Sequence, residues 1–198
     1  GLAAPRPRGP AAPRPVAMGG LSPAQCEKMV DHSRRRSPFV RFMLDKMEEF
    51  GCAVPKSFVS CETCGSSEVN GGFRPDEGVV LCTEHMHSQA DVDAVLTHEL
   101  VHAYDQCRAK NIDWCNCDHH ACSEIRAANL SGDCWLSREV ARGNLTLAKG
   151  HQECVKRRAA LSVAMNPNCS APGQAKAAVK RQFDQCFADT APFDRVPS

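Results

Sequence analysis

Two histidines stand near the middle of the chain, with three residues between them and a glutamate directly after the first. They are His98, Glu99 and His102, in the stretch THELVHAYD. On an α-helix, residues four apart project from the same face, so both imidazoles could reach one metal ion. Glu99 lies about 100° around the helix from His98, close enough for its carboxylate to meet a water molecule beside that metal. The spacing therefore predicts a metal site with an adjacent general base.

This pattern is the H-E-x-x-H motif of zinc peptidases, in which the histidines bind zinc and the glutamate is the general base. The stretch 91–109 favours a helix, because Val92, Leu96 and Leu100 recur at helical intervals and Asp91 is a plausible N-cap. The alternative interpretation is a half-buried helix that carries two hydrogen-bonded histidines.

A catalytic zinc ion needs a third protein ligand. Glu124 follows His102 by 22 residues (124 − 102), in a second predicted helix that Asp118 could cap and that would end before Gly132. A helix–loop–helix would return this carboxylate beneath the histidines, as in thermolysin-like peptidases, so we expect Glu124 to be the third ligand. Its alternative role is a surface ion pair with Arg126. The competing ligands are Asp113, Asp118, His119 and His120.

Other polar groups near the motif could support the chemistry. Asp105 lies seven residues after His98 on nearly the same helix face, where it either orients a ligand imidazole or is a solvated carboxylate. Tyr104, the only tyrosine, points away from that face and is expected to pack in the core. Stabilisation of an oxyanion is therefore expected from another side chain, and the candidates are His119, His120 and Arg126.

The chain contains 13 cysteines, which is too many for an ordinary cytosolic enzyme. Disulfides in an oxidising compartment are the favoured interpretation. A structural zinc ribbon and free buried thiols are the two alternatives. The ribbon would use Cys61, Cys64, Cys82 and His85, which stand at C-x₂-C and C-x₂-H spacing around a hairpin signal, NGG, at 70–72.

Composition limits the architecture. A chain of 198 residues with 42% hydrophobic content can bury one core, so we expect a single domain over 21–198. The net charge of +1 gives no case for direct nucleic-acid binding. Without an apolar run of roughly 18 residues, membrane contact would be peripheral. Residues 1–20 are rich in proline and arginine and are expected to be disordered, with Met18 as the initiator.

The remaining pattern predicts a mostly helical α+β fold. Residues 25–51 form a helical stretch broken near Pro38, and Val40, Met43, Leu44 and Met47 share one face. The arginine run at 34–36 is either a solvated surface or a contact with anionic lipid. We expect a β-hairpin across 57–82, the two helices of the site, further helices over 135–165 and 173–188, and a loop at 166–172.

Several segments together resemble one known family. They are GCAV at 51–54, CETC at 61–64, GGF at 71–73, VLC at 80–82, THELVHAYDQCRA at 97–109 and HHACSEIRAANLSGDC at 119–134. The chain is similar here to the mitochondrial inner-membrane peptidases that also serve as ATP synthase assembly factors, whose vertebrate members are also called Ku-binding proteins. The resemblance covers roughly residues 26–197.

The resemblance implies a zincin-like metallopeptidase domain in which His98 and His102 bind zinc and Glu99 is the catalytic base. It implies a peripheral enzyme of the intermembrane space, on the inner membrane, that trims the leader of ATP synthase subunit a and assists assembly of the membrane sector. His120 stands where a leucine is usual. Ten cysteines match family positions, whereas Cys115, Cys117 and Cys169 do not, and these three are expected to be free thiols.

Two classes of function follow. The first is a zinc endopeptidase that acts on a protein precursor. The second is a non-catalytic assembly chaperone, or a Ku-binding DNA-repair partner, in which the metal site is dispensable. The intact motif favours the first, because a site without catalytic activity would not need to keep Glu99.

Overall fold

The computed structural model describes residues 19–65, 69–109, 111–144 and 150–197, so most of the N-terminal segment predicted to be disordered lies outside it. The predicted mostly helical α+β fold is confirmed. In chain order the elements are α1 (Pro23–Arg36), α2 (Pro38–Glu49), β1 (Val59–Glu62), β2 (Gly71–Arg74), β3 (Gly78–Cys82), α3 (Gln89–Arg108), α4 (Cys117–Leu130), α5 (Leu136–Ala141), α6 (Gly150–Met165) and α7 (Gln174–Ala188).

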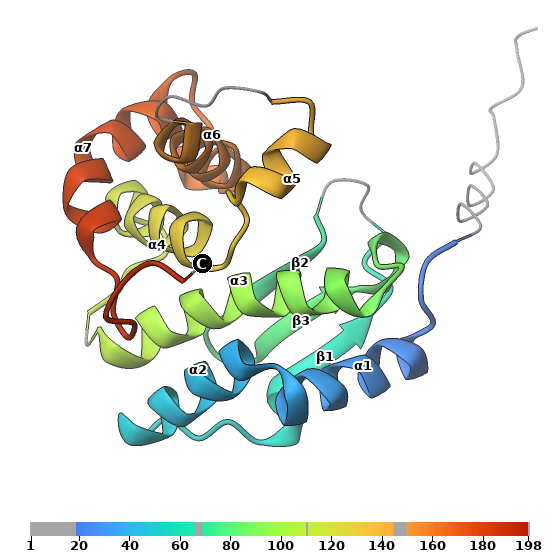
Figure 1. Ribbon diagram of the computed structural model, residues 1–198. Helices are drawn as coiled ribbons and strands as arrows, with labels where there is room; N and C mark the ends of the chain where they lie inside the picture. Colours follow the sequence, from blue (N-terminus) through green and yellow to red (C-terminus); the bar gives the residue numbers. More distant parts are fainter. Residues whose placement is uncertain (1–18, 66–68, 110, 145–149, 198) are drawn as a thin grey trace, which may run out of the picture.

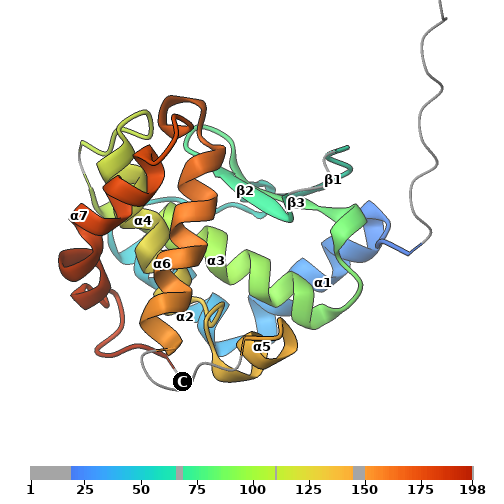
Figure 2. The ribbon, with the colours of Figure 1, turned by 90° about the horizontal axis from the view of Figure 1, so that it is seen from above.

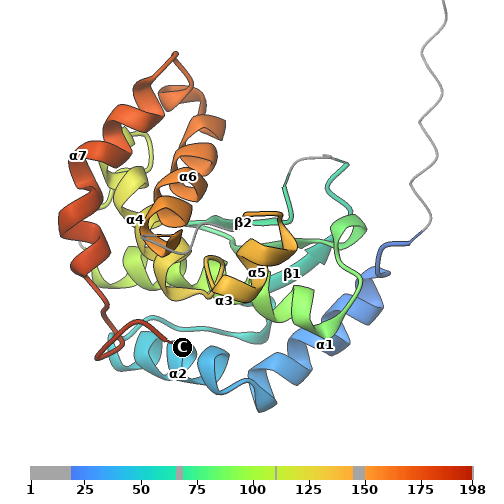
Figure 3. The same cartoon turned by 45° about the horizontal axis from the view of Figure 1, so that its top comes forward.

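Helix α3 runs through the centre of the molecule (Figure 1). On one side it packs against α1, α2, β2 and β3, and on the other it packs against α4. Helices α4, α6 and α7 pack against one another and gather at the end of the molecule away from the sheet (Figures 1 and 3). The helix that carries the motif therefore lies between two groups of elements.

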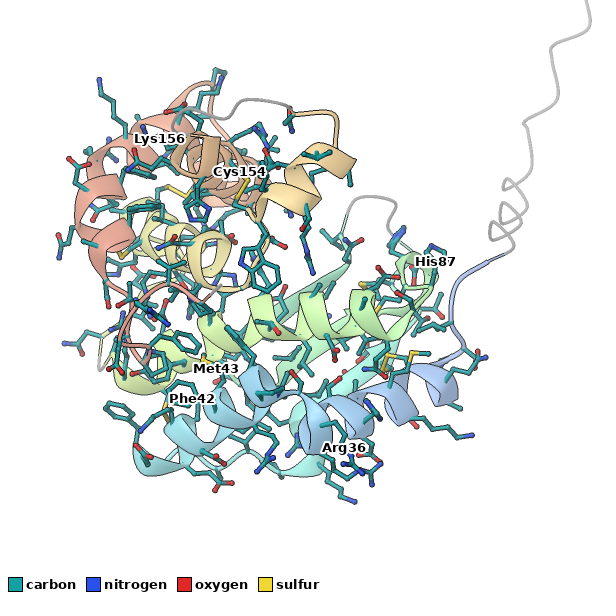
Figure 4. All side chains as sticks on the ribbon, in the orientation of Figure 1. Arg36, Phe42, Met43, His87, Cys154 and Lys156 are labelled. Carbon is teal, nitrogen blue, oxygen red and sulfur yellow. A yellow bond between two sulfur atoms is a disulfide. The ribbon has the colours of Figure 1, made fainter. Side chains whose placement is uncertain are left out.

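The first two helices form as the sequence predicts, with a break just before Pro38. Ser22 and Ser37 cap them, and each helix begins with a proline, whose missing N–H costs nothing in the first turn. The predicted apolar face of α2 is buried, and its members are Val40, Met43, Leu44 and Met47. Figure 4 shows Phe42 and Met43 on the stretch of α2 that lies beside α3.

The predicted hairpin is part of a larger sheet with the strand order β1-β3-β2. Strand β2 pairs antiparallel with β3, as a hairpin requires, but β1 pairs parallel with β3 through the register Val59↔Val79. The turn that was expected at NGG lies instead after Arg74 and leads into Gly78, whose φ of +106° favours glycine. The first residue of β2 must be glycine, because a Cβ on Gly71 would lie 2.7 Å from the carbonyl oxygen of Val80.

Both helices of the site begin at caps other than the ones predicted. Helix α3 begins after Ser88, whose hydroxyl accepts from the N–H of Asp91, so Asp91 is inside the first turn. Helix α4 begins after Asn116, whose side chain accepts from the N–H groups of Asp118 and His119. The predicted end is correct, since α4 stops before Gly132. The helix expected over 135–165 is divided into α5 and α6, and residues 145–149 lie outside the described ranges.

Twelve of the thirteen cysteines, all of which lie in the described ranges, form disulfides. The pairs are Cys26–Cys61, Cys52–Cys107, Cys64–Cys82, Cys117–Cys169, Cys122–Cys186 and Cys134–Cys154. The favoured disulfide interpretation is therefore confirmed, and the alternative zinc ribbon is wrong, because its three cysteines, Cys61, Cys64 and Cys82, are in disulfides. Cys117 and Cys169 were also wrongly expected to be free, since they pair with each other, and only Cys115 has a free and exposed thiol.

Two apolar cores lie on either side of the α3–α4 contact. The first packs α1, α2, the sheet and α3, and the second packs α4, α6 and α7. Helix α4 belongs to both cores, because Ala127 and Leu130 face the first while Ile125 and Ala128 face the second. Figure 2, seen from above, shows α4 and α6 close together and strands β2 and β3 in the upper part of the view. In the described part of the chain, no helix is long and apolar enough to cross a membrane.

Candidate metal centre

Helices α3 and α4 bring three predicted ligands together. One ligand atom from each of His98, His102 and Glu124 lies within 4.8 Å of the others. The Nε2 atom of His98 is 3.5 Å from Oε2 of Glu124, and Nε2 of His102 is 3.6 Å from Oε1 of the same carboxylate. A small residue on α4 permits this approach, because Ala127 is fully buried in the core that includes α3. Glu124 faces the histidines and does not form the alternative ion pair with Arg126.

The tautomer of His102 is set by a chain of hydrogen bonds. Ser123 donates its hydroxyl to Oδ2 of Asp105 at 2.9 Å and lies 2.8 Å from Nδ1 of His102. Since the serine proton is committed to the carboxylate, the Nδ1–H of His102 must donate to the serine oxygen. The lone pair on Nε2 then faces Glu124. Burial lowers the pKa of His102 to about 3, so the neutral imidazole that binds metals prevails at pH 7.

Asp105 therefore orients the candidate ligand His102, but it does so through Ser123 and not by direct contact. It is only 4% exposed, which excludes the solvated alternative. Arg126 is fully buried and donates Nε to Oδ1 of Asp105 at 2.9 Å. Its other nitrogens donate to the backbone oxygens of Asp189 and Ala191, so the segment after α7 helps to hold this network. With these partners, Arg126 is not available to an oxyanion.

His98 has a carboxylate on each side of its ring. Its Nε2 faces Glu124, while Nδ1 lies 3.2 Å from Oδ2 of Asp133, although without the geometry of a full hydrogen bond. Burial would lower the pKa of His98, but Asp133 and Glu124 together raise it well above its usual value. Asp133 follows Gly132, whose φ of +81° turns the chain after α4. A Cβ on Gly132 would lie 2.8 Å from the ring of Trp135, so only glycine fits this turn.

His120 is the third histidine that faces Glu124, and it lies one turn before that residue on α4. The amide of Asn166 donates to Nδ1 of His120 at 3.1 Å, which leaves the proton of the neutral ring on Nε2. That Nε2 is 3.3 Å from Oε1 of Glu124. Burial would raise the pKa of Glu124, but His102, His120 and His98 hold it well below its usual value. His120 is thus placed as a donor toward the carboxylate.

Glu99, the predicted general base, is buried close to His98. Its side chain lines the same cavities as His98, and the residue is 7% exposed. Burial raises the pKa of Glu99 to about 7, although the neighbouring His98 and the backbone N–H of Phe73 act in the opposite direction. A carboxyl group with a pKa near neutral pH is suited to accept a proton and later release it.

Two adjoining cavities meet at the candidate ligands. One, of about 360 Å³, contains His98, His102 and Glu124 and is walled by Phe73 and Trp114. The other, of about 570 Å³, extends from His98 and Glu99 toward α5 and α6. Both are bordered by Gly71, Ser162 and Met165, so they form one cleft between β2 and α6. Strand β2 lies at the edge of its sheet, which leaves backbone groups available to an extended chain.

The other sequence candidates lie outside this cluster. Asp118 pairs with Arg181 at 2.6 Å, and His119 accepts from the N–H of Asp113. Tyr104 packs edge-on against Phe50, as predicted. Three residues of the site were not predicted from the sequence: Ser123, Asp133 and Trp114. Each comes close to the site only because of how its helix or loop packs.

The cluster fits a divalent metal ion. Oε2 of Glu124 is buried without a hydrogen-bond partner among the described residues, which is costly for a carboxylate oxygen. Two imidazole nitrogens and one carboxylate are a donor set that first-row divalent metals accept. A cation between the three groups would satisfy the unpartnered oxygen and offset its charge.

Comparison with known proteins found one matching family and several curated relatives. The model of the Peptidase M76 family matches residues 24–194. The chain is 45% identical to the mitochondrial inner membrane protease ATP23 of Yarrowia lipolytica, over 86% of this chain and 68% of that protein. It is 45% identical to the human homolog, over 87% and 70%, and 38% identical to the Schizosaccharomyces pombe protein, over 86% and 92%. No solved structure matches the chain. The chain therefore belongs to the Peptidase M76 family, together with these mitochondrial inner membrane proteases.

Proposed function

We propose that the protein is a zinc-dependent endopeptidase of the mitochondrial intermembrane space, acting at the inner membrane within one domain over residues 21–198. The observation that carries the proposal is the convergence of His98, His102 and Glu124 within 4.8 Å, with Glu99 in the same cleft. Membership of a peptidase family supports hydrolysis of a peptide bond. The names of the relatives support the location.

In this mechanism His98, His102 and Glu124 would hold zinc, which supplies Lewis acidity to the peptide carbonyl and the attacking water. Glu99 accepts the proton of that water and passes it to the leaving amine. Of the three candidates for stabilising the developing oxyanion, His120 is the one that borders the cleft, and it would have to turn its Nε2–H from Glu124 toward the oxyanion. The free edge of β2 aligns an extended substrate by backbone hydrogen bonds.

The resemblance supports a particular substrate, the precursor of ATP synthase subunit a, and a second role in assembly of the ATP synthase membrane sector. A non-catalytic chaperone or Ku-binding role is the alternative. The geometry favours the peptidase, because a site without chemical use has no need for a buried carboxyl group such as Glu99 beside its ligands.

The direct test compares wild type with Glu99→Gln in purified form. The variant keeps all three metal ligands but removes the base, so we expect normal zinc content and a loss of peptide cleavage on the order of 10²–10⁴-fold. Glu48→Gln, an exposed position on α2, is the matched control and should cleave normally. Normal cleavage by Glu99→Gln would exclude the mechanism.

A cellular test separates the two roles. A strain that lacks its own enzyme is complemented with wild type or Glu99→Gln, and precursor cleavage and ATP synthase assembly are scored separately. We expect Glu99→Gln to fail in cleavage. Assembly that survives in this variant would assign the assembly role to the protein surface and not to the metal site.

A further inference from the structure

The larger cavity of the cleft has an unusual wall of arginines. It is lined by Arg138 and Arg142 near α5 and by Arg158 of α6, together with His98 and Glu99 of the candidate catalytic site. We call these three side chains the arginine arm. They come from elements that do not supply a metal ligand, yet they border the space that a substrate bound at the ligands would enter. A role in substrate recognition follows from this placement.

The carboxylates around the arginine arm do not neutralise it. Asp133 accepts hydrogen bonds from Arg138 at 3.4 Å and from Arg158 at 3.3 Å, which are long for charge-assisted hydrogen bonds, and it also faces His98. Glu139 pairs with Arg142 at 3.1 Å and with Arg157 at 2.7 Å. The three guanidinium groups of the arm therefore share Asp133 and a Glu139 that also pairs with Arg157, which lies outside this cavity. Guanidinium groups in excess of carboxylates, at the wall of a cleft, attract an anionic ligand.

Two further carboxylates line this cavity. Glu99 belongs to the candidate catalytic site, and Asp91 keeps its charge but lies two turns before His98 on α3, where it accepts from the backbone N–H of His87 and the hydroxyl of Ser88. His85 also lines the cavity. The Nε of Arg158 is buried without a hydrogen-bond partner among the described residues. A ligand carboxylate would instead meet the exposed part of this side chain, which is 37% exposed.

The two ends of the cleft differ in chemistry. The smaller cavity is walled by aromatic rings, and Phe73 and Trp114 meet edge-on with their centroids 5.8 Å apart. Leu161 and Met165 border the larger cavity and are 59% and 53% exposed. These exposed apolar side chains suit a peptide more than a small inorganic anion. A chain that passes the metal ligands would thus meet aromatic rings on one side and arginines on the other.

We infer that the arginine arm is a specificity subsite that binds an acidic side chain of the peptide substrate, on the side of the scissile bond away from Trp114. This inference rests on the proposed peptidase function, because it assigns a substrate preference to the same cleft. Arg138 and Arg158 hold the carboxylate by charge-assisted hydrogen bonds, and Arg142 adds to the local positive charge.

The test measures binding, so that it does not depend on turnover. The Glu99→Gln protein is titrated with short labelled peptides that are identical except for a single glutamate or glutamine, placed at each position in turn. We expect the glutamate peptide to bind more tightly at one position, by on the order of tenfold. Arg158→Gln, or Arg138→Gln, should reduce that preference to about twofold or less, and Arg158→Lys should restore part of it.

Arg157→Gln is the matched control. Arg157 adjoins Arg158 on α6, has similar exposure (42% against 37% for the side chains) and pairs with Glu139, but it lines a different cavity. It should keep the full glutamate preference. Zinc content is measured for each variant, because Asp133 contacts both the arm and His98. The preference should be lost from Arg158→Gln protein that still holds zinc.

Equal affinity for glutamate and glutamine peptides at every position would overturn the inference. So would an equal loss in Arg157→Gln and Arg158→Gln, which would indicate general surface charge. Binding to vesicles of anionic phospholipid that is lost in Arg158→Gln, without any glutamate preference among peptides, would assign the arm to a membrane surface instead. Failure of the peptidase proposal would be recognised separately, as normal cleavage by Glu99→Gln.

Discussion

The Nδ1 atom of His102 on α3 lies 2.8 Å from the hydroxyl oxygen of Ser123 on α4. This contact joins the motif helix to the helix that supplies Glu124, and it fixes which nitrogen of His102 is free. The serine in turn is held by Asp105, and Asp105 by the buried Arg126. The orientation of one ligand ring therefore depends on groups that do not touch the metal site themselves.

Ser123→Ala should weaken metal binding while leaving all three ligands in place. Without the serine oxygen, the Nδ1–H of His102 loses its acceptor and the ring is no longer held, so affinity for zinc should fall on the order of 10–100-fold. Competition with a chelator measures the change. Ser33→Ala is the control, because it removes another fully buried hydroxyl that bonds to an aspartate, Asp93, away from the site. Equal effects of the two changes would contradict the orienting role.

The metal ligands themselves can be tested by stoichiometry. We expect one zinc ion per wild-type chain and none in His98→Ala or His102→Ala, because two remaining ligands hold a catalytic ion poorly. Glu124→Gln should bind zinc more weakly and recover part of its activity when excess zinc is added. Elemental analysis after dialysis measures these contents. Two ions in the wild type would contradict the disulfides at Cys61, Cys64 and Cys82.

The thiol state gives an independent check of the fold. In non-reduced protein, an alkylating reagent followed by mass spectrometry should modify Cys115 alone, since the other twelve cysteines are paired. After reduction and unfolding, all thirteen should react. Modification of Cys117 and Cys169 before reduction would show that their pairing is wrong. Loss of one of the six disulfides should cost about 2–5 kcal/mol of stability.

The ion pairs of Asp189 should make the stability of the fold depend on pH. Burial would raise the pKa of Asp189, but Arg108 and Arg126 hold it below the usual value. A carboxyl group whose folded pKa is lowered stabilises the fold above its unfolded pKa, near 4, and this contribution is lost as the pH falls through the folded value. Wild type should therefore be more stable than Asp189→Asn at pH 7, and this difference in the free energy of unfolding should decrease as the pH falls below about 4.

Asp194→Asn serves as the comparison for that experiment, because Asp194 is exposed on the same C-terminal segment. Thermal unfolding at several pH values should show little difference between this variant and wild type. A difference between wild type and Asp189→Asn that is constant from pH 7 to acid would contradict the ion pairs with Arg108 and Arg126.

Local patterns in the sequence were sufficient for several elements. Helix α2 and its buried residues, such as Met43 and Met47, follow from spacing along one face, and the break before Pro38 follows from the chemistry of proline. The placement of His98, Glu99 and His102 on one helix is likewise local, because three or four residues of α-helix fix their relative directions. The end of α4 is also a local feature, because Gly132 can adopt the positive φ that commonly follows a helix.

Only the tertiary structure decided the contacts between segments far apart in the chain. Spacing could not show that Cys117 pairs with Cys169, that β1 adds in parallel to β3, or that His102 meets Ser123. Nor could it place Asp133 beside His98 or gather Arg138, Arg142 and Arg158 at one end of the cleft. The sequence by itself determined which residues could bind a metal, since helix geometry is local. The groups that orient those residues and line the cleft depend on how α3, α4 and α6 pack. Packing brings together residues that are far apart in the sequence, and their separation along the chain does not predict which of them will be in contact.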